Sequence, residues 1–146
     1  MKPIHMTLAL SLALSAGTAL FAKEGVTNPT VKARQDTMQT IRRNTAVLGD
    51  MAGGKTAFDP AAAAAAKAEL AAAAAEIPVK FEPQEGDPKS EAKPEIWTGW
   101  DDYVQKAEAL VAAAEAVDTA SLDGVRAGMG AIGGACKSCH ETYRLD

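Results

Sequence analysis

The sequence predicts an all-α protein, an antiparallel up-down-up-down four-helix bundle. Hydrophobic residues make up 47% of the 146 residues and aromatic residues only 5%, and the abundant alanine is the strongest helix former. Four helical segments can be identified, three with an apolar stripe at helical spacing and one as an alanine run. A chain of this length has room for one hydrophobic core, so we expect a single folded domain.

The first 22 residues are predicted to be a secretory signal peptide. They begin with Lys2, continue as an apolar stretch from Leu8 to about Ala16, and end in small residues at Ala22, which is the layout of such a signal. Even counted to Ala22, the 15 residues from Leu8 are fewer than the roughly 20 needed to span a bilayer. We therefore expect residues 23–146 to be exported to the periplasm as one domain, without stable membrane insertion.

The charge of the exported domain argues against nucleic acid as a partner. Cleavage after Ala22 removes Lys2, so the 15 basic residues become 14 against 19 acidic ones, a formal net charge of −5. Phosphate contacts need clustered lysine and arginine, and the sequence has no basic run. Partner proteins or a small molecule are the expected ligands. Cleavage also removes His5, which leaves one histidine in the mature chain.

The first two helices are predicted from the same start signal, an N-cap side chain followed by proline. Asn28-Pro29 opens the first helix, which continues to Gly53-Gly54, and Asp59-Pro60 opens an alanine-rich second helix that Pro78 is expected to stop. Small alanine side chains let helices approach closely or leave room for a bulky cofactor. The apolar stripe predicted for the first helix comprises Val31, Met38, Ile41, Val47 and Leu48.

Residues 78–94 form the only long connection, and their four prolines and many charges predict irregular structure. A connection of this length is either disordered or functional, and the alternative without a function is a solvated crossover that wraps over the bundle. A third helix is expected from Pro94-Glu95, with a stripe of Trp97, Trp100, Val104, Ala107, Val111 and Ala114. A fourth follows a cap between Asp118 and Ser121, with a stripe of Leu122, Val125, Met129, Ile132, Cys136, Cys139 and Tyr143. Both cysteines should therefore face the bundle interior.

The segment CKSCH, with Cys136, Cys139 and His140, is the candidate for chemistry. A disulfide is the usual reason for two cysteines in an exported protein, but a bridge across so short a loop stabilises little. A thioredoxin-like dithiol needs a βαβ context, and a structural zinc site needs four ligands where the mature chain offers three. Thioether bonds to the two vinyl groups of a haem, with His140 on the iron, remain. We expect one covalently attached haem c.

The position of this motif near the carboxyl end, on the last of four helices, resembles the class II cytochromes c, meaning cytochrome c-prime and its low-spin relatives of the c-556 type. The resembling segments are VKARQDTMQTIRRN, GKTAFDPAA, KPEIW and GGACKSCHETYR. The resemblance implies a four-helix bundle with one haem. It also implies that a homodimer through the first two helices is an option, which the alanine-rich faces permit without requiring.

The sixth position of the iron decides the function. The mature chain has no second histidine, so methionine, a common ligand that raises the haem potential, is the next candidate. Met129 lies on the same helix as His140, roughly 16 Å before it, and Met51 lies at the far end of the first helix. Met38 lies at the level of His140 in an antiparallel bundle, and low-spin class II members use a methionine in this part of the helix. We predict that Met38 is the distal ligand; the alternative is that it only packs on the haem.

Three further residues are candidates for the haem surroundings. Arg34 lies one helical turn before Met38, with Gln35 beside it, so both could reach the haem propionates; a solvated arginine is the alternative. Arg144 lies four residues after His140 and hence on the same helix face. A cation there would disfavour protonation of the imidazole and raise the reduction potential. Alternatively, it is an ordinary cation at a helix C-terminus.

The residues predict an electron carrier rather than an enzyme. No general acid, base or nucleophile is arranged around the motif, because the one histidine of the mature chain is assigned to iron. With His140 and Met38 as ligands, the protein is expected to carry single electrons between redox partner proteins. The alternative is a five-coordinate cytochrome c-prime that binds nitric oxide or carbon monoxide.

Overall fold

The computed structural model describes residues 25–145, in which the regular structure is helical. The helices are α1 (Pro29–Ala52), α2 (Pro60–Ala75), α3 (Ile77–Phe81), α4 (Glu95–Thr98), α5 (Trp100–Glu115) and α6 (Leu122–Tyr143). None of the helices in this part of the chain is long and apolar enough to cross a membrane. The predicted signal peptide, residues 1–22, lies outside the described residues.

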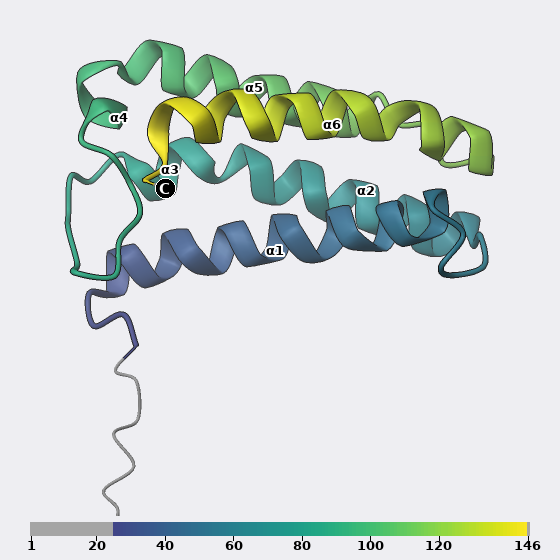
Figure 1. Cartoon of the computed structure of the whole chain (residues 1–146), viewed down its shortest axis with the longest axis horizontal. Coiled ribbons are helices and arrows are strands. Elements are labelled where there is room, and N and C mark those ends of the chain that lie inside the picture. The colour runs from purple at the N-terminus through teal and green to yellow at the C-terminus, as the bar shows by residue number, and fades with distance from the viewer. Residues whose placement is uncertain (1–24, 146) are drawn as a thin grey trace, which may run out of the picture.

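The four long helices α1, α2, α5 and α6 form the antiparallel up-down-up-down bundle that the sequence predicts. Each long helix runs opposite to the one before it in the chain, and the first and last helices pack on each other (Figure 1). The short helices α3 and α4, with the connection between them, gather at one end of the bundle (Figure 1). The same end holds the start of α1 and the end of α6.

The predicted N-caps of α1 and α2 are both present. The side-chain oxygen of Asn28 accepts hydrogen bonds from the backbone N–H of Thr30 at 2.9 Å and of Val31 at 3.1 Å, and Asp59 caps α2 in the same way. Proline follows each cap at the first helical position, where its missing N–H leaves no bond unmade. These local interactions explain why both start points could be predicted.

Two helix boundaries differ from the prediction. Pro78 does not end helical structure, because the chain re-forms a short helix, α3, with Pro78 in its first turn, where proline is tolerated. The irregular part of the crossover is therefore residues 82–94. The expected third helix is interrupted at Gly99, which separates α4 from α5.

The buried face of α5 is rotated relative to the predicted stripe. Tyr103 and Leu110 are buried together with Ala107 and Ala114, whereas Val104 and Val111 are only partly buried. The stripe predicted for α6 is confirmed. Its buried members are Val125, Ile132 and Tyr143, and both cysteines are half-buried.

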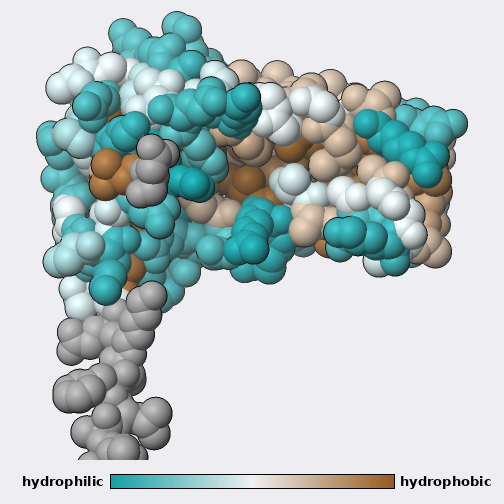
Figure 2. Space-filling view, viewed as in Figure 1, coloured by the Kyte–Doolittle hydropathy of each residue, from teal (hydrophilic) through white to brown (hydrophobic). Residues whose placement is uncertain are grey.

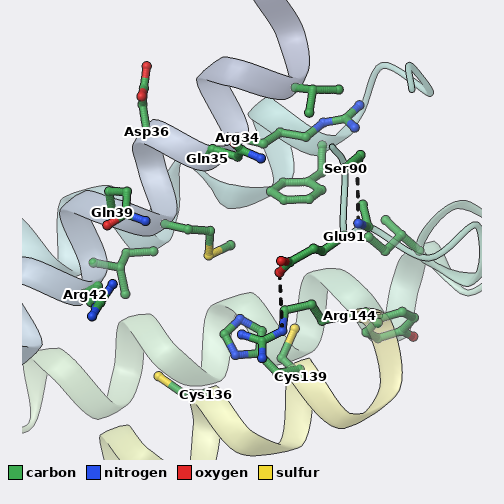
Figure 3. A pocket seen from close by; sticks show the side chains of 18 of the residues that line it. Arg34, Gln35, Asp36, Gln39, Arg42, Ser90, Glu91, Cys136, Cys139 and Arg144 are labelled. Atoms are coloured by element: carbon green, nitrogen blue, oxygen red, sulfur yellow. Dashed lines mark hydrogen bonds and ion pairs between the residues drawn. The ribbon is translucent and has the colours of Figure 1, made fainter. Parts of the chain in front are cut away.

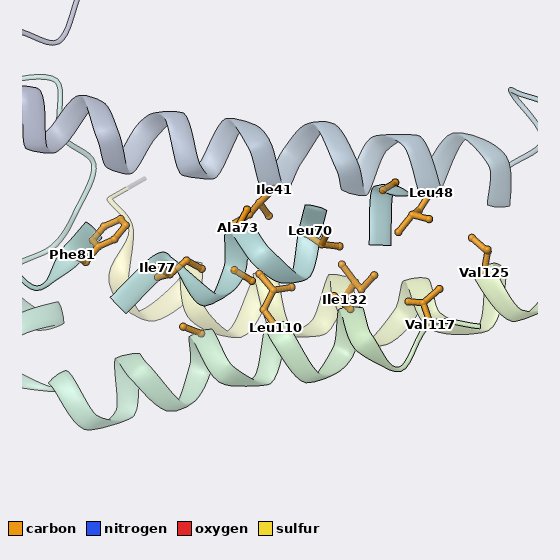
Figure 4. Close-up of a cluster of buried hydrophobic side chains, with 14 of the residues drawn as sticks. Ile41, Leu48, Leu70, Ala73, Ile77, Phe81, Leu110, Val117, Val125 and Ile132 are labelled. Carbon is orange, nitrogen blue, oxygen red and sulfur yellow. The ribbon is translucent and has the colours of Figure 1, made fainter. Parts of the chain in front are cut away.

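The core between the long helices is built mainly from aliphatic side chains and alanine (Figure 4), and it also contains the rings of Phe81, Tyr103 and Tyr143. In α1, Val47 was predicted to face this core but is 38% exposed. Asn44, three residues earlier, is buried instead. The side-chain amide of Asn44 donates to the Thr40 carbonyl at 3.0 Å. The largest fully buried side chains are Tyr103, Leu48, Leu70, Ile96, Ile132, Val31, Val117 and Val125.

Gly124 and Gly130 of α6 form a matched pair that tests how the last helix packs. A Cβ at Gly124 would lie 2.5 Å from the carbonyl oxygen of Asp118, whereas nothing lies within 4 Å of a Cβ at Gly130. Gly130→Ala is expected to raise the free energy of unfolding by about 0.5–1 kcal/mol, because alanine favours the helix. Gly124→Ala is expected to lower it, because the turn before α6 must move. Urea unfolding measures both signs, and a stabilised Gly124→Ala protein would contradict this packing.

Candidate functional site

A cavity of about 860 Å³ lies between α1 and α6, at the end of the bundle where the crossover passes. Figure 2 shows this face of the molecule, with hydrophobic residues visible in the hollow between the two helices. The volume falls within the roughly 300–1,000 Å³ that is typical of small-molecule and cofactor sites. The lining is largely apolar, and its large apolar side chains include Val31, Met38, Ile41, Phe81, Ile96 and Tyr103.

The three predicted residues of the CKSCH motif line this cavity from α6. Cys136 and Cys139 are free thiols and lie on the side of α6 that faces the cavity (Figure 3). Burial raises the pKa of both thiols, that of Cys139 to about 11. Burial, together with the positive charge of Arg144, lowers the pKa of His140. Both effects on His140 favour the neutral imidazole that a metal ion requires.

The opposite wall of the cavity is formed by α1, which contributes Met38. Among the methionines of the described residues, Met38 alone lines the cavity. Met51 is buried in the core at the other end of α1, and Met129 of α6 packs near Gly49. The structure therefore brings Met38 to the same cavity as the CKSCH motif, and whether its sulfur ligates iron stays a prediction.

Arg34 also lines the cavity, and the alternative of a solvated arginine is wrong. It is only 2% exposed, and burial lowers its pKa. Its Nε donates to the Lys80 carbonyl at 3.1 Å, its Nη1 to the Glu85 carbonyl at 2.8 Å, and its Nη2 to the Pro83 carbonyl. The guanidinium carbon lies 5.1 Å from the centre of the Phe81 ring. A guanidinium has five N–H donors, and these carbonyls engage three of them. A haem propionate would bind the remaining N–H groups, and this contact stays a prediction.

Gln35 and Arg144 lie at the rim of the same cavity. The side-chain amide of Gln35 donates to the Lys89 carbonyl at 3.2 Å. Arg144 follows the last residue of α6, and its Nε lies 3.8 Å from the carboxylate of Glu91 (Figure 3). The cation near His140 is therefore paired with a carboxylate from the crossover. The roles of Gln35 and Arg144 toward a haem remain predictions.

Sequence reasoning left open that the long connection is functional, but it did not place the connection in the site. Ser90, Glu91 and Ala92 line the cavity, and Ala92 forms an isolated antiparallel bridge with Arg144. These contacts join residues more than fifty positions apart in the chain. Since neither periodicity nor a local motif accompanies such a contact, the sequence holds no sign of it.

Residues 29–144 match the protein family described as Cytochrome C′. The chain belongs to the cytochrome c′ family. It is 36% identical over 154 aligned residues to cytochrome c-554 of Cereibacter sphaeroides, a match that covers 99% of this chain and 98% of that protein. It is 35% identical over 119 residues to cytochrome c-556 of Agrobacterium tumefaciens, covering 79% and 96% of the two chains.

Solved cytochrome c′ structures share the fold. One from Rhodobacter spheriodes matches with a TM-score of 0.73 and 27% identity, covering 80% of this chain and 95% of that one. A nitric oxide complex of a cytochrome c prime variant from Alcaligenes xylosoxidans matches with a TM-score of 0.71 and 29% identity, covering 80% and 94%. The predicted four-helix bundle and the family resemblance are confirmed.

As a member of the cytochrome c′ family, the protein is a c-type haem protein, and the residues around the cavity fit that group. Two thiols three residues apart and an imidazole line one wall, and a largely apolar lining suits a porphyrin. The Oγ1 of Thr45, on the same lining, is buried without a hydrogen-bond partner in the structure. In the described residues, no group of three or more His, Cys, Asp or Glu side chains forms a rival metal site.

Proposed function

We propose that the protein is an exported carrier of single electrons, in which Cys136, Cys139 and His140 would hold one haem c and Met38 would be the distal iron ligand. The observation that supports this is the meeting of Met38 and the CKSCH motif in one cavity, from the facing helices α1 and α6. When bound, the haem supplies the one-electron redox chemistry. The protein's own residues hold it, exclude water and adjust its potential.

The four side chains have separate tasks. Cys136 and Cys139 would anchor the group through thioether bonds to one helix, α6. His140 would offer a neutral imidazole nitrogen, which its lowered pKa favours, and Met38 would offer a soft thioether that raises the reduction potential. Because both ligands come from helices of one rigid bundle, the same ligands can stay in place in both oxidation states.

The surroundings of the ligands would raise the potential further. The largely apolar lining excludes water, and such a surrounding disfavours added positive charge on the iron. Arg144 at the rim acts in the same direction, and its pairing with Glu91 at 3.8 Å moderates that effect. Both residues are exposed enough for solvent to screen their charges.

The protein is proposed to work in the periplasm, because residues 1–22 have the composition of a signal peptide. Redox proteins are the proposed partners. A homodimer through α1 and α2 is proposed as an option, which the alanine-rich faces permit. A related cytochrome c′ is described as showing ligand-controlled dimer dissociation.

Reversible binding of a diatomic gas is the second candidate function. It is favoured by the solved nitric oxide complex of a related cytochrome c prime. For this chain it requires an iron that Met38 leaves open or releases easily. The two functions therefore differ in one bond, between Met38 and the iron.

Visible spectra of the reduced holoprotein, recorded with and without carbon monoxide, test the proposal. A low-spin, six-coordinate spectrum that does not change with the gas is expected, because Met38 would occupy the sixth position. A high-spin spectrum with ready binding of carbon monoxide would overturn the Met38 assignment and favour gas binding.

A further inference from the structure

We infer that the crossover, residues 82–94, positions Met38 and thereby sets how firmly the sixth position of the iron is closed. We call these residues the strap. The inference rests on the proposed ligation by His140 and Met38. It follows from where the strap is fastened, because its contacts lead to the start of α1 and to the end of α6, the two helices that carry these ligands.

The middle of the strap is fastened to the start of α1 through Asp87. One oxygen of its carboxylate accepts hydrogen bonds from the Thr27 N–H at 2.9 Å, the Thr27 hydroxyl at 3.0 Å and the Asn28 N–H at 3.0 Å. The other oxygen accepts from the Lys89 N–H at 2.8 Å, within the strap. Asn28 is the N-cap of α1, and its side chain also donates to Glu85 at 2.7 Å. One carboxylate therefore joins the strap to the residue that fixes where α1 begins.

The first residues of the strap are fastened to α1 by Arg34. The buried guanidinium donates to the carbonyls of Pro83 and Glu85 and, just before the strap, of Lys80. Arg34 lies four residues before Met38 and hence on the same face of α1. Any rotation or shift of α1 that moves Met38 away from the cavity would strain or break these hydrogen bonds.

The last residues of the strap are fastened to the chain that follows His140. The Lys93 N–H donates to the Tyr143 carbonyl at 2.9 Å, and the Leu145 N–H donates to the Glu91 carbonyl at 2.8 Å. The strap thus pairs with the end of α6 at a point three to five residues beyond the proposed iron ligand.

The cavity explains why such a connection matters. Where α1 and α6 face each other across it, their side chains line a hollow rather than a close-packed contact. Functional groups must be held to within about 0.5 Å of their working positions, which is the task of the residues behind them. The strap holds the two helices in register at this end of the bundle, and loosening it would let the Met38 sulfur leave the iron.

Asp87→Ala in the holoprotein tests the inference, with Asp59→Ala as a matched control. Like Asp87, Asp59 accepts backbone N–H bonds at the start of a helix, but it is itself the N-cap of α2 and does not touch the strap. Asp87→Ala is expected to weaken the sulfur-to-iron absorption band of the oxidised protein. The rate of carbon monoxide binding to the reduced protein should rise about tenfold or more, which is the usual size of the coupling between two sites of one protein. Asp59→Ala is expected to lower the Tm and to leave both signals unchanged.

Arg34→Lys provides a second, independent test, because lysine keeps the positive charge but cannot reproduce the planar fork of donors. It is expected to shift both signals in the same direction as Asp87→Ala. Wild-type signals in both variants, with only a lower Tm, would overturn the inference and leave the proposed function intact. A five-coordinate wild-type protein would overturn both, and it would be recognised before any variant is made.

Discussion

Replacing Cys136 and Cys139 together by alanine is expected to give a protein with no covalently bound haem. Each thioether bond needs a cysteine sulfur, and these two sulfurs line the cavity from α6. Haem that enters the cavity of the double variant would be held only by its axial ligands and by packing, so denaturation would release it. Mass spectrometry of the denatured chain, compared with wild type, measures the loss of one haem mass.

Ser138→Ala is the control for this experiment. Ser138 lies between the two cysteines, and its hydroxyl accepts a hydrogen bond from Lys106 at 3.1 Å on the exposed side of α6. It should keep the full haem mass, because it removes neither a sulfur nor the imidazole. Covalent haem on the double variant would contradict the assignment of these two cysteines.

Met38→Ala is expected to convert a low-spin haem protein into a high-spin one that binds carbon monoxide readily. The change removes the proposed sixth ligand, and alanine is too short for any atom to replace the sulfur. The reduction potential is expected to fall, because a methionine ligand raises it. Spectra of the reduced protein with carbon monoxide, together with redox titration, measure both effects.

Two further variants separate ligation from packing. Met38→Leu keeps nearly the same apolar volume but removes the sulfur, so it should behave like Met38→Ala in spin state. Met129→Leu removes a methionine that lies outside the cavity lining and should behave like wild type. An unchanged low-spin spectrum in Met38→Leu would mean that Met38 only packs on the haem.

The features that could be predicted from the sequence are those with a local cause. Asn28 and Asp59 cap their helices through bonds to residues two and three positions away. The CKSCH motif has its spacing within one helical turn. The level of Met38 beside this motif could be predicted because the rise per residue of a helix is constant, so a count of residues gives the position along an antiparallel pair. Its ligation of iron stays a prediction.

The features that could not be predicted depend on contacts between distant segments. The stripe of α5 was placed with the wrong phase, since counting from Trp97 ignores the interruption at Gly99. Tyr103 is buried through its packing on the rings of Phe81 and Tyr143, at centroid distances of 5.4 and 5.2 Å. The burial of Arg34 depends on carbonyls about fifty residues away, and no periodic pattern in α1 indicates them.

The composition of α6 has a consequence for the order of events during maturation. Five of its 22 residues are glycine, and each costs about 1 kcal/mol relative to alanine in a helix interior. Alone, this segment has little tendency to be helical, so we expect it to remain an open peptide until the rest of the bundle packs against it. Folding half-buries both cysteines, and this burial raises the pKa of both thiols, which makes them poorer nucleophiles. A newly made chain would therefore present its thiols to haem at the stage when they are most reactive and accessible, and close around the product afterwards.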